Sequence, residues 1–201
     1  MVNHTATDRT VMKAQSPLVA FWASFKENRG ALAGLVILAT IIIVAIFADI
    51  IAPHSYTDQY RDFTKLPPAW VDGGNDKFWL GTDALGRDML SRLIFGARIS
   101  LFIGLSVMIV SVIAGIALGL VAAYLGGAVD AVMMRLMDLI LSIPSLVLAI
   151  LVVSILGPSL INTIVAVSVV YLPNYVRLVR ASALAEFGKD YVISARVAGV
   201  G

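Results

Sequence analysis

Three long uncharged runs stand out along the chain, and they predict helices that cross a membrane. The first covers 31–48, ALAGLVILATIIIVAIFA, which is close to the roughly 20 residues that span the hydrocarbon core of a bilayer. The second covers 99–129 and the third 139–176. The third run is too long for one helix, and GPS at 157–159 divides it, because a Gly-Pro pair marks a turn.

Glycine and charge positions locate the ends of these predicted helices. The Gly126-Gly127 pair is expected to end the second crossing near Tyr124. The first run is not read as a cleaved signal peptide, because the segment that precedes it is long and polar and no A-x-A cleavage site follows it. We therefore predict four crossings, at about 31–51, 99–124, 137–156 and 159–176.

Composition agrees with a membrane protein and narrows the chemistry. Hydrophobic residues make up 59% of the chain and charged residues 14%, against about 25% charged in soluble domains. Cysteine is absent, which excludes disulfides and thiol chemistry. His4 and His54 lie outside every apolar run, which argues against a metal site or a histidine dyad within the membrane. A net charge of +2 argues against nucleic acid as a partner.

The distribution of basic residues predicts the orientation. Four crossings place both termini on one side, and the basic residues on that side are Lys26, Arg29, Arg135, Arg177, Arg180, Lys189 and Arg196. Basic residues favour the cytoplasmic side, so we expect cytoplasmic termini and an extracytoplasmic loop at 52–98. That loop also carries six basic residues, which opposes this orientation, although it carries several aspartates too.

Two segments outside the crossings are expected to form peripheral helices. In 16–30, Ser16 can cap a helix and Pro17 suits its first position. Leu18, Trp22 and Phe25 then share one face, typical of an interfacial helix that either anchors the first crossing or binds a partner.

In 81–104, Thr82 or Asp83 is expected to cap a helix that lies on the membrane surface and leads into the second crossing. Asp88 and Arg92 are four residues apart and are expected to pair. No nucleophile–base pair accompanies them, so a catalytic site is not expected.

Small, polar and kinking residues within the crossings predict packing contacts. Gly115 and Gly119 have the G-x-x-x-G spacing that lets helices approach closely, and Gly30 and Gly34 repeat it. Arg135 and Asp138 are close enough to pair, and Pro144 is expected to kink the third crossing. Five hydroxyls in the apolar runs either bond helices together or line a polar path: Ser106, Ser111, Ser154, Thr163 and Ser168. No ionisable residue lies near a midplane, which argues against proton-coupled transport.

The closing stretch has the pattern of an amphipathic helix over 184–199. Its apolar or small positions are Leu184, Phe187, Gly188, Tyr191, Val192, Ala195, Ala198 and Gly199, and they recur at helical spacing. The helix is too short and too charged to cross. It is therefore expected to be either a docking surface or a packed interfacial helix.

Four blocks of the sequence closely resemble ABC-transporter permeases of the oligopeptide/dipeptide family, especially the C-type permease. The blocks are FWASFKENRGALAGLVILA followed by IAP, GTDALGRDMLSRLIFGARISL, MRLMDLILSIPSLVLAI and VRLVRASALAEFGKDYVISARVAGVG. The resemblance runs from about residue 18 to the end and implies an all-α, multi-pass, type-1 importer domain. On this basis 1–30 is a cytoplasmic tail, 99–201 is part of the permease core, and 177–201 is its cytoplasmic coupling segment.

The resemblance also implies where the ATPase binds. The family's E-A-A-x-x-x-G loop, aligned on Gly199, is matched here only at Ala195 and Gly199. The variant Y-V-x-A-A-R-x-x-G-A fits better, with a serine in place of its first alanine. The residues that carry this resemblance, and that are expected to form the ATPase-docking loop, are Tyr191, Val192, Ala195, Arg196 and Gly199.

The function implied by the resemblance is a permease subunit of an ATP-driven importer of di- or oligopeptides in a bacterial inner membrane. Its partners would be a sister permease, two ATP-binding subunits and an extracytoplasmic peptide-binding protein. The chain itself lacks a Walker-type phosphate loop, so it is not expected to be the ATPase. It is also expected to be no enzyme and to hold no cofactor or metal. Import of another small solute, such as nickel or glutathione, and a non-transporting scaffold role are the alternatives. Family members continue through two more crossings, so this sequence is expected to be a fragment or a truncated frame.

Overall fold

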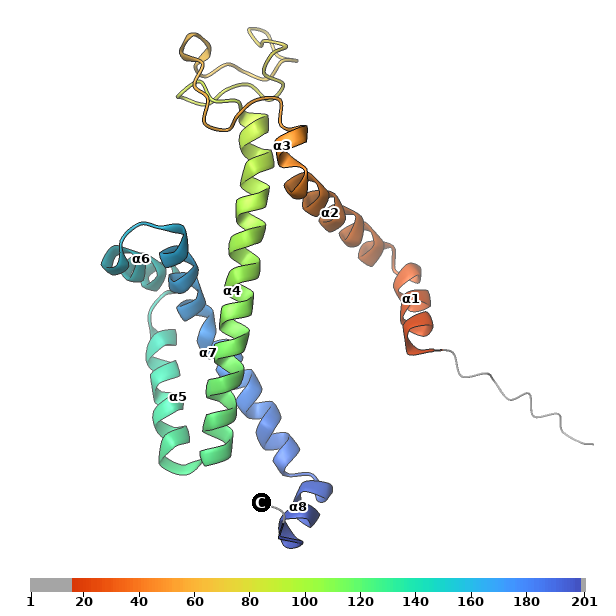
Figure 1. Ribbon diagram of the computed structural model, residues 1–201, viewed down its shortest axis with the longest axis vertical. Helices are drawn as coiled ribbons and strands as arrows, with labels where there is room; N and C mark the ends of the chain where they lie inside the picture. The colour runs from red at the N-terminus through yellow and green to blue at the C-terminus, as the bar shows by residue number, and fades with distance from the viewer. Residues whose placement is uncertain (1–15, 200–201) are drawn as a thin grey trace, which may run out of the picture. The chain divides into compact units, whose positions relative to one another are not determined.

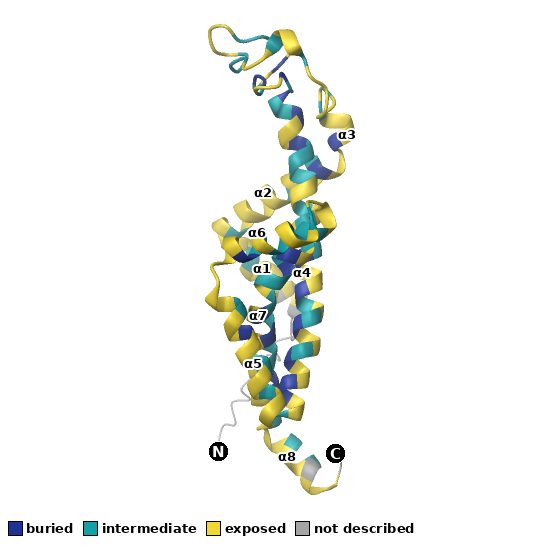
Figure 2. Ribbon diagram, turned by 90° about the vertical axis from the view of Figure 1, so that its left-hand side faces the viewer, coloured by how far each residue is buried: buried dark blue, intermediate teal, exposed yellow. Residues whose placement is uncertain are grey.

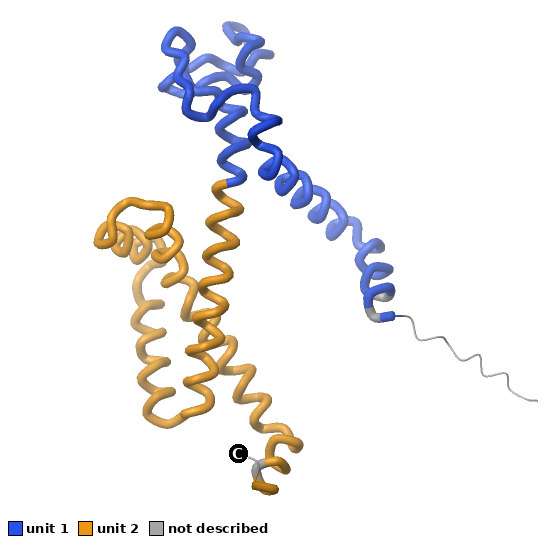
Figure 3. The backbone as a smooth tube through the Cα atoms, viewed as in Figure 1, with its two compact units in different colours: residues 1–98 blue, residues 99–201 orange. Residues whose placement is uncertain are grey.

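The computed structural model describes residues 16–199, and within that range every regular element is helical. Figure 1 shows the helices in chain order. They are α1 (Pro17–Glu27), α2 (Arg29–Ile46), α3 (Ala48–Ile51), the 3-10 helix η1 (Arg61–Phe63), α4 (Met89–Leu125), α5 (Gly127–Ser142), α6 (Ser145–Leu156), α7 (Leu160–Phe187) and α8 (Asp190–Val197). The chain forms two compact units, residues 1–98 and 99–201 (Figure 3), and α4 runs from the first into the second.

The first two helices of unit 1 begin at capping residues. The Ser16 side chain accepts a hydrogen bond from the Val19 N–H, and a proline opens α1, as predicted. The Asn28 side chain accepts bonds from the N–H groups of Gly30 and Ala31, at 3.0 and 3.1 Å, and so begins α2. The side chains of α2 are almost entirely exposed (Figure 2), and Ala45 is its buried residue. An apolar helix with this exposure suits a lipid environment.

The C-terminal end of α2 is bound by an arginine from the start of α4. The Arg98 guanidinium donates to the carbonyls of Ala45 (2.7 Å) and Ile46 (3.1 Å) and pairs with Asp49 at 2.9 Å. The last carbonyls of a helix have no partner inside the helix. Arg98 therefore satisfies them and fixes the point at which the chain leaves α2 for the loop.

The loop between α3 and α4 folds around one aromatic side chain. Phe78 is completely buried and contacts the rings of His54, Tyr60 and Phe63 at centroid distances between 5.1 and 5.6 Å. The loop returns to its own start at Gly86, whose carbonyl accepts a hydrogen bond from the Tyr60 N–H at 3.0 Å. These contacts give the loop a small core of its own.

Unit 2 is a helical bundle in which α7 is the central element. It packs against α5 and α6, and it meets α4 at the predicted glycine pair. A Cβ atom at Gly115 would lie 2.4 Å from the Cβ of Tyr175, and one at Gly119 would lie 2.8 Å from the Val176 carbonyl oxygen. The G-x-x-x-G prediction for α4 is confirmed. The other predicted pair has no such contact among the described residues, since nothing lies within 4 Å of a Cβ at Gly34.

Pro144 breaks the apolar region between α5 and α6 by 97°. The predicted kink is therefore confirmed, and it is a sharp bend. The GPS turn is also confirmed, because α6 ends at Leu156 and α7 begins at Leu160. Among the described residues, three helices are long and apolar enough to cross a membrane: α2, α4 and α7. The bent pair α5–α6 would be a fourth crossing if it forms one span, which agrees with the four crossings predicted.

The prediction of a separate surface helix before the second crossing is wrong. Residues 89–98 are instead the first turns of the single continuous helix α4. The apolar stripe that suggested a separate helix continues without a break into the membrane run, and no glycine or proline interrupts it before Gly96. A helix that continues keeps its backbone hydrogen bonds, whereas a bend would leave several unsatisfied.

Candidate functional site

The predicted docking residues lie on α8 and directly after it. Tyr191, Val192, Ala195 and Arg196 belong to α8, and Gly199 follows two residues after its end. The prediction of one continuous helix over 184–199 is wrong, because α7 ends at Phe187 and α8 begins at Asp190. The side chain of Arg196 and the last two residues of the chain lie outside the described part of the structure.

A glutamate at the end of α7 fixes the junction with α8. Lys189 Nζ lies 2.6 Å from the carboxylate of Glu186, and the Tyr191 hydroxyl donates to the same carboxylate. Glu186 raises the pKa of Lys189 and that of Tyr191, chiefly because each donates a hydrogen bond to its carboxylate, and the negative charge of Glu186 adds to the effect. Glu186 was not among the predicted site residues, although its spacing of three residues from Lys189 is one at which helical side chains pair.

The surface of α8 is mostly exposed and partly apolar. Tyr191, Ile193 and Val197 are exposed, the last by 85%, whereas Val192 and Ala195 are half-buried. Gly199 has a φ of +81° and no atom within 4 Å of a Cβ built on it. A short helix with exposed apolar and small residues can accept another protein at close range.

Two ion pairs between α5 and α7 lie in the same unit. Arg180 binds Asp130 through two hydrogen bonds, and Arg177 binds Asp138. The predicted pair of Arg135 with Asp138 is wrong, since Asp138 contacts α7 instead. The helices run antiparallel, so the earlier aspartate meets the later arginine. Figure 1 shows the α4–α5 turn and α8 at the same end of this unit.

In unit 1, Asp83 organises the segment before α4. Its carboxylate accepts hydrogen bonds from the N–H groups of Leu85 (2.8 Å) and Arg87 (2.9 Å) and from the Arg87 and Arg92 guanidinium groups. Partial burial raises the pKa of Asp83, but these bonds outweigh it and lower that pKa to about 2. The predicted pair of Asp88 with Arg92 is wrong, because Arg92 reaches Asp83.

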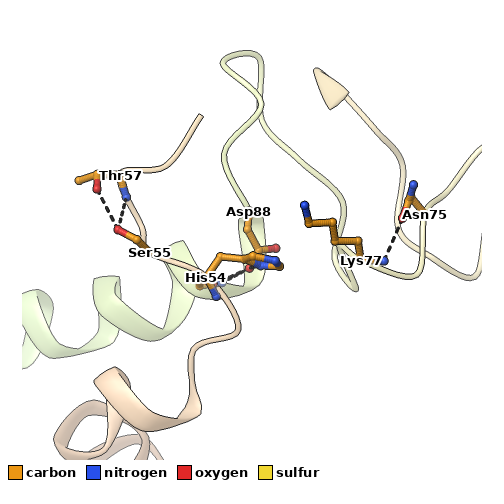
Figure 4. Close-up of polar contacts among 7 residues, drawn as sticks. His54, Ser55, Thr57, Asn75, Lys77 and Asp88 are labelled. Carbon is orange, nitrogen blue, oxygen red and sulfur yellow. Dashed lines mark hydrogen bonds and ion pairs between the residues drawn. The ribbon is translucent and has the colours of Figure 1, made fainter. Parts of the chain in front are cut away.

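Asp88 is buried and caps α4 instead. It accepts bonds from the N–H of Ser91 (3.0 Å) and from its hydroxyl (2.5 Å), and His54 Nδ1 lies 3.4 Å away (Figure 4). The prediction of Thr82 or Asp83 as the cap of this helix is wrong. The Thr82 hydroxyl accepts a bond from the Leu66 N–H instead. The described residues contain no cluster of histidine, aspartate or glutamate that could hold a metal ion.

Comparisons with known proteins cover both units. The family of binding-protein-dependent transport system inner membrane components matches residues 115–201, which include α5 to α8. The N-terminal transmembrane domain of oligopeptide transport permease C matches residues 16–68. The chain belongs to the binding-protein-dependent inner membrane permeases.

Individual relatives of this permease are similar along all or most of the chain. A di/tripeptide transport system permease protein, DppC, from Pseudomonas aeruginosa is 50% identical over 100% of the chain and 66% of its own length. The dipeptide permease DppC of Haemophilus influenzae is 49% identical over 93% of the chain and 63% of its own length. The dipeptide permease DppC of Escherichia coli K12 is 48% identical over 97% of the chain and 66% of its own length. The chain thus spans just under two thirds of the length of these relatives.

Proposed function

We propose that this permease forms part of the translocation path of an ATP-driven importer of dipeptides or short oligopeptides. The observation that carries the proposal is the similarity to a di/tripeptide permease, which reaches 50% identity over the entire chain, both units included. The permease performs no chemistry of its own. Its helices move as rigid bodies and expose the path alternately to the two sides of the membrane.

The partners proposed are a sister permease, two ATP-binding subunits and an extracytoplasmic peptide-binding protein. The permease contacts an ATP-binding subunit through α8, with Tyr191, Val192, Ala195, Arg196 and Gly199 at the contact. Exposure of α8 and the small residues on it support this role. Because Glu186 ties the start of α8 to the end of α7, a displacement of α8 is passed to α7 instead of being absorbed by the turn.

The orientation proposed has α1 and α8 in the cytoplasm and the 52–88 loop outside the cell. It can be tested because the chain contains no cysteine. A single cysteine at exposed Ser55 should react in intact cells with a maleimide that cannot cross membranes, after that reagent has passed the outer membrane. One at exposed Ser194 should react only after the inner membrane is opened. The reverse pattern would contradict the orientation.

The transport proposal is tested by uptake. Deleting the gene for this permease in its own host should abolish uptake of a radiolabelled dipeptide, and restoring it should return uptake. Uptake that persists without the permease, in a host with no second dipeptide transporter, would refute the proposal. Loss of uptake for a different solute alone would keep the importer and change the substrate.

The ATPase contact is tested separately, by copurification. Gly199→Trp should reduce the amount of ATP-binding subunit that copurifies with the tagged permease, because a bulky residue at this φ distorts the end of the segment. Gly188→Ala is the matched control, since a Cβ there meets atoms no closer than 3.7 Å. Equal copurification of both variants would rule out this segment as the contact.

A further inference from the structure

The loop of unit 1 contains a pocket that none of the features above uses. It is an open pocket of about 350 Å³, lined by Ala69, Trp70, Asp76 and Trp79. The two tryptophan side chains are 68% and 67% exposed. Large aromatic side chains so exposed on a folded loop often belong to a binding site. A carboxylate beside two indole rings adds a negative charge to the negative faces of the rings.

The backbone beneath the pocket is held in place. The Ala69 N–H donates to the Trp79 carbonyl at 3.1 Å, which joins the two ends of the turn. The Gly74 N–H donates to the Val71 carbonyl at 2.8 Å, and a Cβ at Gly74 would lie 2.3 Å from the Pro68 oxygen. Phe78, the residue directly before Trp79, is fully buried and so anchors the chain at this point. The pocket is therefore formed before any ligand arrives, which reduces the entropy lost on binding.

The nearest basic residue of the same turn is directed elsewhere. Lys77 Nζ lies 4.4 Å from the ring centroid of Tyr60 and 5.5 Å from that of Phe78, so its ammonium is occupied by those rings. Its N–H donates to the Asn75 side chain (Figure 4). Asp76 takes part in no ion pair within the described residues. Two indole rings and one carboxylate are thus left for a cation from outside.

From the length of α4 we expect the pocket to lie beyond the reach of the lipid headgroups. Arg98 binds the carbonyls of Ala45 and Ile46, which mark the end of the apolar helix α2. Met89, the first residue of α4, is nine residues farther along the helix, a rise of about 14 Å. Headgroups extend only about 5–8 Å beyond the hydrocarbon. Since the loop ends at this first residue of α4, we expect its tryptophans to face water and not lipid.

We propose that the pocket formed by Trp70, Asp76 and Trp79 binds an alkylammonium group. The faces of indole rings attract cations, most strongly when a ring and a charge act together, and the pocket is large enough for an ammonium on a short carbon chain. Two sources present such a group outside the cell: the amino terminus of a free peptide and a lysine side chain of a protein. The ligand chemistry does not depend on the proposed transport function, but the place of the pocket outside the cell rests on the orientation proposed above.

The test uses tryptophan fluorescence of the full-length permease in nanodiscs. The chain has three tryptophans, so Trp22→Phe leaves Trp70 and Trp79 as the emitting residues. Titration with n-butylammonium should change their emission in a saturable way, whereas n-butanol at matched ionic strength should not. Asp76→Asn should weaken the binding by about threefold or more. Asp72→Asn, an exposed aspartate on the same turn that does not line the pocket, is the matched control.

Further titrations separate the two sources. A free dipeptide that binds like butylammonium, while its N-acetylated form does not, identifies the peptide amino terminus as the ligand. Binding of butylammonium without any response to the dipeptide identifies a lysine side chain. No saturable change, or the same affinity in Asp76→Asn, overturns the proposal. Strong quenching of Trp70 and Trp79 by brominated lipid also overturns it, because the tryptophans would then lie in the membrane.

Discussion

The loop of unit 1 and the helical bundle of unit 2 are held together in different ways. In the loop, single polar side chains each make several hydrogen bonds: Asp83 accepts from two backbone N–H groups and two guanidinium groups. In the bundle, backbone bonds are satisfied within each helix, and the close contact of α4 with α7 depends on Gly115 and Gly119. The irregular backbone of the loop needs side-chain partners for its polar groups. Helices satisfy these groups internally, so the stability of the bundle depends on how well the helix surfaces fit together.

The largest effect is expected from a glycine on which the loop closes. Gly86 has a φ of +76°, and a Cβ there would lie 2.2 Å from the Tyr60 carbonyl oxygen. Gly86→Ala should destabilise the loop by about 2–4 kcal/mol, since it combines backbone strain with a clash. Gly157→Ala, at a φ of +89° with nothing within 4 Å, isolates the strain and should cost about 1–2 kcal/mol. The effect of Gly86→Ala is measured by the urea dependence of proteolysis in the loop. The effect of Gly157→Ala is measured by the urea dependence of unfolding of the bundle.

The bundle should respond next most strongly, at the α4–α7 contact. Gly115→Ala places a methyl group 2.4 Å from the Tyr175 Cβ and should cost about 1–3 kcal/mol through overpacking. Gly104→Ala in the same helix has nothing within 4 Å and should leave stability within about 0.5 kcal/mol or raise it. Unfolding in sodium dodecyl sulfate, followed by circular dichroism, reports the difference. Equal unfolding midpoints for the two variants would mean that the close contact between α4 and α7 does not contribute to stability.

Removal of the α4 cap should have an intermediate effect on the loop. Asp88→Ala loses the bonds to Ser91 and should cost about 1–2 kcal/mol. The cost is moderated because Asp88 Oδ1 has no hydrogen-bond partner among the described residues, so its removal also relieves an unsatisfied buried group. Asp58→Ala, at an exposed position of the same loop, serves as the control. Proteolysis rates that do not distinguish Asp88→Ala from this control would show that the cap is dispensable.

The smallest effect is a pH dependence confined to the loop. The pKa of Asp83 is lowered from 3.8 to about 2 in the folded chain. The stability that this carboxylate provides is therefore complete above about pH 5 and is lost as the pH falls toward 2. Asp83→Asn should remove this part of the acid sensitivity, whereas Asp62→Asn, exposed on the same loop, should not. Proteolysis between pH 6 and pH 3 measures it, and a wild-type loop with no pH dependence there would contradict it.

The same contrast explains which features could be predicted from the sequence. The turns at Gly126-Gly127 and at 157–159, the bend at Pro144 and the glycine contact on α4 were predicted, because each depends on local residue type. These features belong to the bundle, in which hydrophobic periodicity and helix breakers carry most of the information.

The errors concern charged side chains, whose partners are set by tertiary structure. Arg92 and Asp88 have the spacing of a helical pair, but Asp88 lies just before the first residue of α4 and is used as its cap. Asp138 had a nearby arginine in sequence, yet its partner is 39 residues away on α7. The spacing of charged residues along the sequence indicates which ion pairs are possible. It does not determine which of them form, because that depends on which helices become neighbours.

The two ion pairs between α5 and α7 have a consequence for how the chain is made. Asp130 and Asp138 are synthesised 50 and 39 residues before the arginines that neutralise them. At about 5–20 residues per second, that interval lasts roughly 2–10 s. During this time the two carboxylates of α5 lack the arginines that neutralise them in the folded bundle. The docking of α5 against α7 therefore waits for a later segment of the same polypeptide, and a ribosome that stalls before Arg177 would leave this helix without its partner.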